Sequence, residues 1–270
     1  MARTMPTPVM HLALADELLS GEDLPADVCR LLVARRGAFL LGNTAPDVQT
    51  VSGQSRFETH FYHVPRKTDV PAHEALFARY PYLADPQRLM PSHVAFLAGY
   101  LAHVLLDELW LEQIFLRYFE KRPWSTRYER HFVHNVLRAW LDRRDQRRLD
   151  GELVTALKEA EPEGWLPFVD DAFLRRWRDW LVDQLRPGRH IETVEVFAQR
   201  MGVPPEEMEA LLSSPQEMEE RVFARVPRQA LDAFQKEGYA RTAVFITRYV
   251  RGELLPVDRP EEEVSYAARG

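Results

Sequence analysis

The chain of 270 residues contains one cysteine, Cys29, and therefore cannot form an intramolecular disulfide. Small secreted domains often depend on such cross-links, but a chain of this length buries roughly three quarters of its unfolded surface and needs none. Cys29 lies in an apolar stretch that predicts a helix, where it is expected to be a small buried residue. This cysteine usage is typical of a reducing compartment, and the expected location is cytoplasmic.

The sequence also lacks a long uninterrupted apolar segment. His11, Asp16 and Glu17 break the apolar stretch near the start of the chain, so no signal peptide is predicted. No apolar run reaches about 18 residues without a polar break, and no transmembrane segment is expected. No polybasic amphipathic stretch indicates binding to a membrane surface.

An excess of positive charge is missing as well. The formal net charge is −6, so the chain carries no specific nucleic-acid signal. The apolar content of 46% and the charged content of 28% are ordinary for a soluble globular protein. No feature of the sequence predicts the oligomeric state.

Helical periodicity dominates the sequence, and no strand pattern, internal repeat or low-complexity segment is evident. The chain is therefore predicted to be all-α, a single-domain multi-helix bundle over residues 1–257 with a helical C-terminal extension. A sub-boundary near residues 161–164 is the alternative, and the polar tail 258–270 is expected to fray. The pattern predicts a long central helix from Pro91 to about Phe119 and a long loop region over residues 42–70.

His103 and Asp107 form the most informative pair in the chain. They lie four residues apart in the otherwise apolar central helix, so their side chains share one face. A buried carboxylate is costly unless it is neutralised. A neighbouring imidazole would do this, and a divalent metal held by both side chains would do it better.

Three further candidate ligands precede this pair. His11 opens an apolar helix, Asp47 ends the segment Gly-Asn-Thr-Ala-Pro-Asp, and His60 follows Thr59. Each has an ordinary alternative: a histidine on an apolar helix is more often a hydrogen-bonded core residue, and Ala-Pro-Asp is most often a turn or a helix cap. The remaining histidines are weaker candidates for metal ligands. They are His63, which could replace His60, His73 and His93 at helix starts, and His190 in a loop.

Imidazole nitrogen and carboxylate oxygen are ligands of zinc, and manganese or iron would also accept them. His103 and Asp107 would bind from a rigid helix while Asp47 and His60 close the shell from a loop. His11 could reach a second metal, which Asp107 could bridge. One or two zinc ions are therefore expected, and two ions about 3.5–4 Å apart suit the cleavage of phosphoesters.

The neighbours of these residues carry a family resemblance. The ordered string of His11, Gly42 to Asp47, Thr59-His60-Phe61, and Gly99-Tyr100 leading to His103 and Asp107 resembles the zinc-dependent phospholipase C family, which shares its fold with S1/P1-type nucleases. Trp110, which follows Asp107, resembles the pattern of the intracellular branch of this family. The resemblance covers roughly residues 5–135 and implies an all-helical fold with a metal cluster in a cleft. It implies one metal among Asp47, His60, His103 and Asp107, another at His11 and Asp107, and Asp47 as general base.

The chain departs from the pattern of the secreted members in two ways. They use the free amino end of the mature chain as a ligand, whereas ten residues precede His11 here. They also hold a further zinc with a His-x-x-x-Glu pair, which is broken in this chain. His131 and His134 lie three residues apart and are less certain candidates for a substitute site. We therefore expect a divergent intracellular member.

The leading hypothesis is a metal-dependent phosphoesterase that hydrolyses a phosphodiester or a phospholipid head-group with metal-activated water. The alternative is a catalytically degenerate helical binding or structural protein, with or without a structural metal. A His/Asp-type phosphohydrolase of another helical fold is less favoured, because the chain lacks the adjacent His-Asp dipeptide. The expected partner is a small phosphoester or phospholipid-like substrate.

Overall fold

The computed structural model describes residues 5–186 and 191–254. Among these residues every regular element is helical and no strand occurs, which confirms the all-α prediction. The predictions for His190 and for the tail 258–270 lie outside the described residues. The single-domain organisation and the sub-boundary near residues 161–164 stay predictions.

The first third of the chain forms short helices around the N-terminal helix. Thr7 caps this helix, and Pro8 occupies its first turn, where the missing N–H costs nothing. The elements are α1 (Pro8–Ser20), α2 (Ala26–Ala34), α3 (Arg36–Gly42), the 3₁₀ turn η1 (Ala45–Val48), α4 (Gln49–Ser52), α5 (Arg56–His60), α6 (Ala72–Arg79), and the 3₁₀ turns η2 (Pro81–Ala84) and η3 (Pro86–Arg88).

The centre of the fold is α7 (Pro91–Trp110), which continues as the π-helical segment η4 (Leu111–Glu120). This continuous helix agrees with the predicted central helix. By length and composition, Pro91–Glu120 is apolar enough to cross a membrane, but 94% of its most apolar window is buried inside the protein. Such burial is typical of a core helix, since the surrounding helices already cover its apolar surface.

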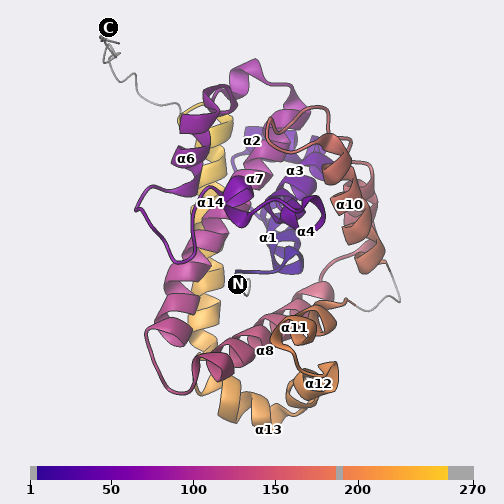
Figure 1. Ribbon diagram of the computed structural model, residues 1–270. Coiled ribbons are helices and arrows are strands. Elements are labelled where there is room, and N and C mark those ends of the chain that lie inside the picture. The colour runs from indigo at the N-terminus through magenta and orange to yellow at the C-terminus, as the bar shows by residue number, and fades with distance from the viewer. Residues whose placement is uncertain (1–4, 187–190, 255–270) are drawn as a thin grey trace, which may run out of the picture.

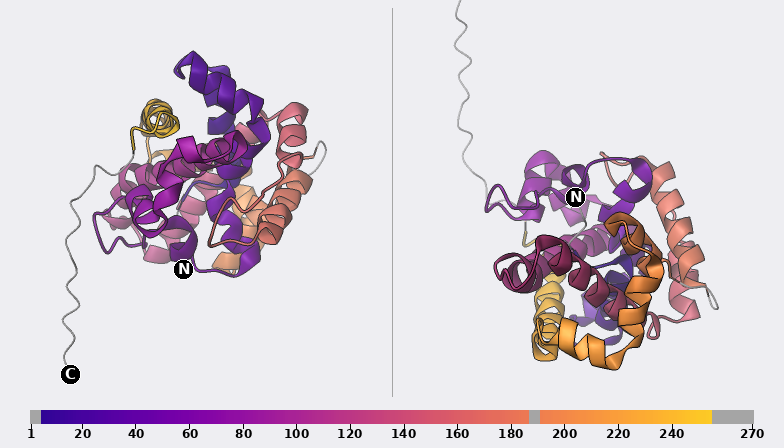
Figure 2. Two further views of the ribbon diagram at one scale, coloured as in Figure 1. Left: turned by 90° about the horizontal axis from the view of Figure 1, so that it is seen from above. Right: turned by 60° about the horizontal axis from the view of Figure 1, so that its bottom comes forward.

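The second half packs around this centre. Its elements are α8 (Arg127–Gln146), α9 (Gly151–Lys158), α10 (Asp171–Leu185), α11 (Thr193–Met201), α12 (Pro205–Ser213), α13 (Pro215–Glu217), the π-helical turn η5 (Met218–Phe223) and α14 (Arg228–Val250). Figure 1 shows α14 running beside α7, while α8 lies with α11 and α12 at the base of the view. The second view of Figure 2 brings this base forward, where α11 and α12 pack against α8.

The predicted loop over residues 42–70 is only partly irregular. It contains η1, α4 and α5 between its turns. These helices have four or five residues each, so hydrophobic periodicity has too few turns in which to appear. Ser55 and Glu58 form a capping box that starts α5, and this local hydrogen bonding is what makes so short a helix possible.

Candidate metal centre

Four helical elements bring the five main candidate ligands together. His11 comes from α1, Asp47 from η1, His60 from the last position of α5, and His103 and Asp107 from α7. They form two overlapping triads, His11–His103–Asp107 and Asp47–His60–His103, within which the ligand atoms lie no more than 4.8 Å apart. Buried histidine and aspartate groups therefore meet at one place and could form a metal site.

The distances between the candidate ligand atoms are close to the ligand–ligand distances of a metal site. Asp107 Oδ1 lies 3.3 Å from His11 Nε2, and Asp107 Oδ2 lies 3.5 Å from the Nε2 atoms of His60 and His103. Asp47 Oδ1 lies 3.8 Å from His60 Nε2. Ligands bonded to zinc at 2.0–2.1 Å in a tetrahedron would be about 3.3 Å apart. The donor set therefore fits a zinc ion.

Two of the imidazoles are held in place by their other nitrogen. The Nδ1 atom of His103 lies 2.7 Å from the carbonyl oxygen of Asn43, and Nδ1 of His60 lies 3.0 Å from Thr59 Oγ1. Tyr100 in turn donates a hydrogen bond to the carbonyl oxygen of Thr59. Partners of this kind fix the ring orientation and leave Nε2 directed at the centre.

The close contact between α3 and α7 explains why glycine occupies positions 42 and 99. A Cβ atom at Gly99 would lie 2.2 Å from the carbonyl oxygen of Phe39, and one at Gly42 would lie 1.9 Å from that of Phe96. Only glycine allows the two helix backbones to approach this closely. The approach places the Asn43 carbonyl against His103, so the two glycines help to position this ligand.

The centre is almost completely shielded from solvent. The side chains of His11, His60 and Asp107 are fully buried, and that of Asp47 is 7% exposed. Within the described residues, His11 Nε2, His103 Nε2 and Asp107 Oδ1 have no hydrogen-bond partner. Buried polar atoms usually have partners, and their absence at three atoms that face one another is what a cation-binding site requires.

Electrostatics favour the protonation states that bind metal. Burial, reinforced by neighbouring His103, lowers the pKa of His11 to about 4, against the opposing pull of Asp107. Burial by itself would raise the pKa of Asp107, but His103 and Arg56 outweigh it and hold that pKa well below its usual range. At neutral pH His11 is therefore an uncharged imidazole and Asp107 a carboxylate.

Arg56 is a member of the centre that the sequence did not reveal. Its Nη2 atom donates to Asp107 Oδ2 and to the Tyr62 hydroxyl, 2.7 Å away, and Tyr62 itself donates to Asp107 Oδ2 at 3.2 Å. Arg56 precedes His60 by four residues in α5, and this spacing was the signal that could have found it. A cationic side chain thus accompanies the ligands.

The less certain histidines lie elsewhere. His134 accepts a hydrogen bond from Trp110 Nε1 at 3.2 Å, and His131 faces Glu120 at 3.9 Å. The structure does not bring this pair into either triad, and within the described residues neither belongs to a group of three possible ligands. The other candidates are occupied by local contacts: His63 stacks on Phe57, His73 packs against Phe245, and His93 Nε2 lies 2.7 Å from the Trp165 carbonyl oxygen.

A cavity adjoins the centre at Asp47. It has an empty volume of about 770 Å³, part of it open to solvent, and lies between the start of α1 and helices α8, α10 and α11. Its walls are mostly apolar and include Trp177, Trp180, Leu181 and Phe197. Of the five candidate ligands, Asp47 lines this cavity, so it is the one that meets the space where a small molecule would enter.

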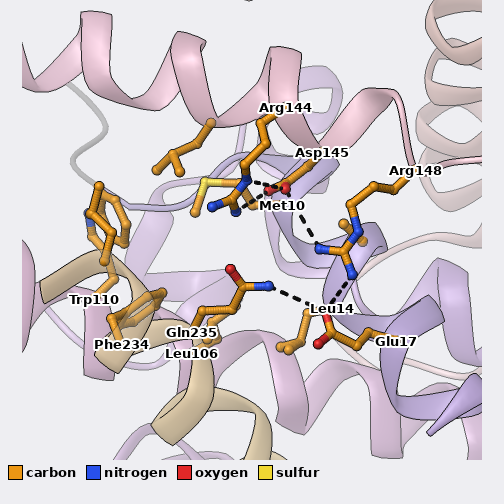
Figure 3. A pocket seen from close by; sticks show the side chains of 13 residues that line it. Met10, Leu14, Glu17, Leu106, Trp110, Arg144, Asp145, Arg148, Phe234 and Gln235 are labelled. Carbon is orange, nitrogen blue, oxygen red and sulfur yellow. Dashed lines mark hydrogen bonds and ion pairs between the residues drawn. The ribbon is translucent and has the colours of Figure 1, made fainter. Parts of the chain in front are cut away.

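A second cavity lies on the other side of α1, with an empty volume of about 460 Å³ (Figure 3). Figure 3 shows that part of its lining is a chain of ion pairs and hydrogen bonds among Arg144, Asp145, Arg148, Glu17 and Gln235. Among the described residues that line it, none is a candidate metal ligand. Its only carboxylates, Asp145 and Glu17, are already paired with arginine.

Comparison of the chain with protein-family models, with curated proteins and with solved structures gives no match. The resemblance to zinc-dependent phospholipases C therefore rests on the motif residues alone.

Proposed function

We propose that the protein is a metal-dependent phosphoesterase. The single observation that carries the proposal is the convergence of histidine Nε2 atoms and aspartate oxygens at separations of 3.3–3.8 Å in a buried centre. When bound there, zinc would polarise a phosphoryl oxygen and make a water molecule more acidic. The phospholipase C resemblance of the motif supports this class of reaction.

The residues divide into holding and reacting groups. His60, His103 and Asp107 would hold the ion, and His11 would support Asp107 from α1. Asp47 stands at the boundary with the cavity, so its carboxylate is placed to orient the attacking water and to accept its proton. General bases placed in this way contribute about 10²–10⁴-fold to a rate.

The adjoining cavity indicates the character of the substrate. Its walls are mostly apolar and suit an apolar group on a phosphoester. The phosphoryl group would sit at the centre while the organic part extends from Asp47 between α1 and α10. A small amphipathic phosphoester is the substrate proposed.

Hydrolysis of bis(p-nitrophenyl) phosphate by the zinc-loaded protein tests this proposal. Asp47→Asn should reduce kcat by about 10²-fold or more while the protein stays folded. Asp145→Asn serves as the matched control, because Asp145 is an equally buried aspartate that belongs to the other cavity. Equal activity in the wild type and Asp47→Asn, or no activity in any zinc-loaded sample, contradicts the proposal.

A structural metal site is the second candidate function. The near-complete burial of the ligands favours it, since structural zinc sites are closed whereas catalytic ones keep an open position. In that case chelation would lower the melting temperature, and the zinc-loaded protein would hydrolyse no phosphoester. Hydrolysis by the zinc-loaded protein therefore separates the two functions.

A further inference from the structure

The positive charge that a second metal ion would add to the centre has an alternative source in this chain. The oxygens of Asp107 face different partners: Oδ1 faces His11, whereas Oδ2 faces His60 and His103 and also accepts hydrogen bonds from Arg56 and Tyr62. The guanidinium therefore already lies on the oxygen that faces two imidazoles.

The histidines also favour one ion over two. His103 belongs to both triads, but its Nδ1 lies 2.7 Å from the Asn43 carbonyl oxygen, so only Nε2 can bind metal. A neutral imidazole nitrogen has one lone pair and binds one ion. Once an ion binds His103 as part of one triad, the other triad keeps only two ligands, fewer than the three that a zinc site takes from the protein. The ring of His11 stacks on that of His103 at 3.7 Å, so one ion cannot lie in both ring planes, and His11 Nε2 instead faces Asp107 Oδ1 at 3.3 Å.

The charge balance of the centre also favours one metal ion. Asp47 and Asp107 supply two negative charges, which one divalent ion neutralises. With Arg56 the net charge is then about +1, whereas a second ion would raise it to about +3 in a buried site, at high cost. A net charge of about +1 suits an incoming phosphodiester anion.

Arg56 is also placed to meet such an anion. Its side chain is 19% exposed and Nη2 lies on Asp107, while its buried Nε has no hydrogen-bond partner among the described residues. Burial works against its charge, but Tyr62, Asp107 and Asp47 together raise its pKa above the ordinary value. A guanidinium has five donors, and the two contacts of Nη2 leave others for phosphoryl oxygens.

We propose that the centre holds a single divalent ion and that the Arg56 guanidinium is the second cationic group, which binds an oxygen of the substrate phosphoryl group. This inference rests on the proposed phosphoesterase function for the identity of the anion, but the number of ions and the part played by Arg56 can be measured without catalysis.

The experiment counts zinc and measures the binding of inorganic phosphate. Full-length protein is loaded in zinc-buffered solution, its zinc content is determined by elemental analysis, and phosphate is titrated calorimetrically. We expect one zinc per chain in the wild type and in Arg56→Gln, with phosphate affinity about tenfold to a hundredfold weaker in the variant. Arg66→Gln is the matched control, because Arg66 is similarly buried and pairs with the next carboxylate of α7, Glu108. Its phosphate affinity should equal that of the wild type.

Two tightly bound zinc ions in the wild type, or equal phosphate affinity in Arg56→Gln and Arg66→Gln, overturn the inference. If Arg56→Gln does not fold, Arg56→Lys decides: it keeps the charge but loses the forked donors, and its phosphate affinity should fall several-fold. One zinc and Arg56-dependent phosphate binding without diester hydrolysis would remove the proposed function and leave this inference standing. Two zinc ions with hydrolysis would do the reverse.

Discussion

The imidazole ring of His11 lies flat against that of His103, with centroids 3.7 Å apart and planes inclined by 14°. The two residues belong to α1 and α7, which are far apart in the chain. Burial, and then the neighbouring His103, lower the pKa of His11 to about 4, so this ring is uncharged at neutral pH. An uncharged ring is compatible with a cation bound among its neighbours.

Zinc should therefore stabilise the protein. At a free zinc concentration a hundredfold above the Kd, binding adds about 2.7 kcal/mol, which corresponds to roughly 5–10 °C in Tm for a chain of this size. His103→Ala and Asp107→Ala should lose this response, whereas His93→Ala should keep it, since His93 bonds to a backbone carbonyl away from the centre. Differential scanning calorimetry with zinc and with a chelator measures the effect. An equal zinc response in all four proteins contradicts the metal site.

The support of His60 by Thr59 gives a subtler prediction. Thr59→Val keeps the shape of the side chain but removes the hydroxyl 3.0 Å from His60 Nδ1. We expect zinc affinity to fall about 10–100-fold with little change in helical content. Competition with a chromophoric chelator measures the affinity, and Thr155→Val on the exposed surface of α9 serves as the control. Unchanged affinity in Thr59→Val would show that the hydroxyl does not orient the ligand.

The contact between α3 and α7 should tolerate no side chain at residue 99. A Cβ there would lie 2.2 Å from the Phe39 carbonyl oxygen and 2.8 Å from Asn43 N, so the helices must separate. Gly99→Ala is expected to lower the free energy of unfolding by about 1–3 kcal/mol or more and to weaken zinc binding. Gly151→Ala, where the new methyl group meets no atom within 4 Å, should be neutral or slightly stabilising. Urea unfolding of both variants makes the comparison, and similar stability in the two would refute the close packing.

Asp142 gives a prediction on pH. It is fully buried beside the cavity and accepts hydrogen bonds from Thr7 and from Thr193 at 2.6 Å, but burial prevails over these donors and raises its pKa to about 7. Because the folded state then binds a proton that the unfolded state releases near pH 4, this group destabilises the protein as pH rises between those values. From pH 5 to pH 8 the loss amounts to at most about 3 kcal/mol.

Asp142→Asn should remove this dependence, because an amide cannot ionise. Relative to the wild type, the variant should gain stability as the pH rises from 5 to 8. Urea unfolding of the metal-free proteins at several pH values measures the difference. A constant difference across that range would show that Asp142 is already ionised at pH 5.

Hydrophobic periodicity in the sequence predicted the long helices of this protein. The central helix and the shared face of His103 and Asp107 follow from spacing alone, because one helical turn places both on one side. The order of His11, Asp47 and His60 indicated further ligands but not how they would meet. That depends on the close approach of α3 and α7 at Gly42 and Gly99, which is a tertiary contact.

Arg56 was missed for a different reason. It lies in a segment whose helices are too short to show periodicity, and a single arginine near a loop is ordinary in a chain rich in arginine. Its four-residue spacing to His60 was the one available signal, but its partner Asp107 is distant in sequence, so the sequence did not show which residue it pairs with. The cavity at Asp47 was also beyond prediction, since α1, α8, α10 and α11 build it jointly.

An anomalous-difference map recorded at the zinc absorption edge, from crystals of the zinc-loaded protein, tests the central claim most directly. We expect one strong peak about 2 Å from the Nε2 atoms of His60 and His103, with Asp47, Asp107 and His11 around it. Strong zinc density at another place in the molecule, or no density between these side chains, would contradict it.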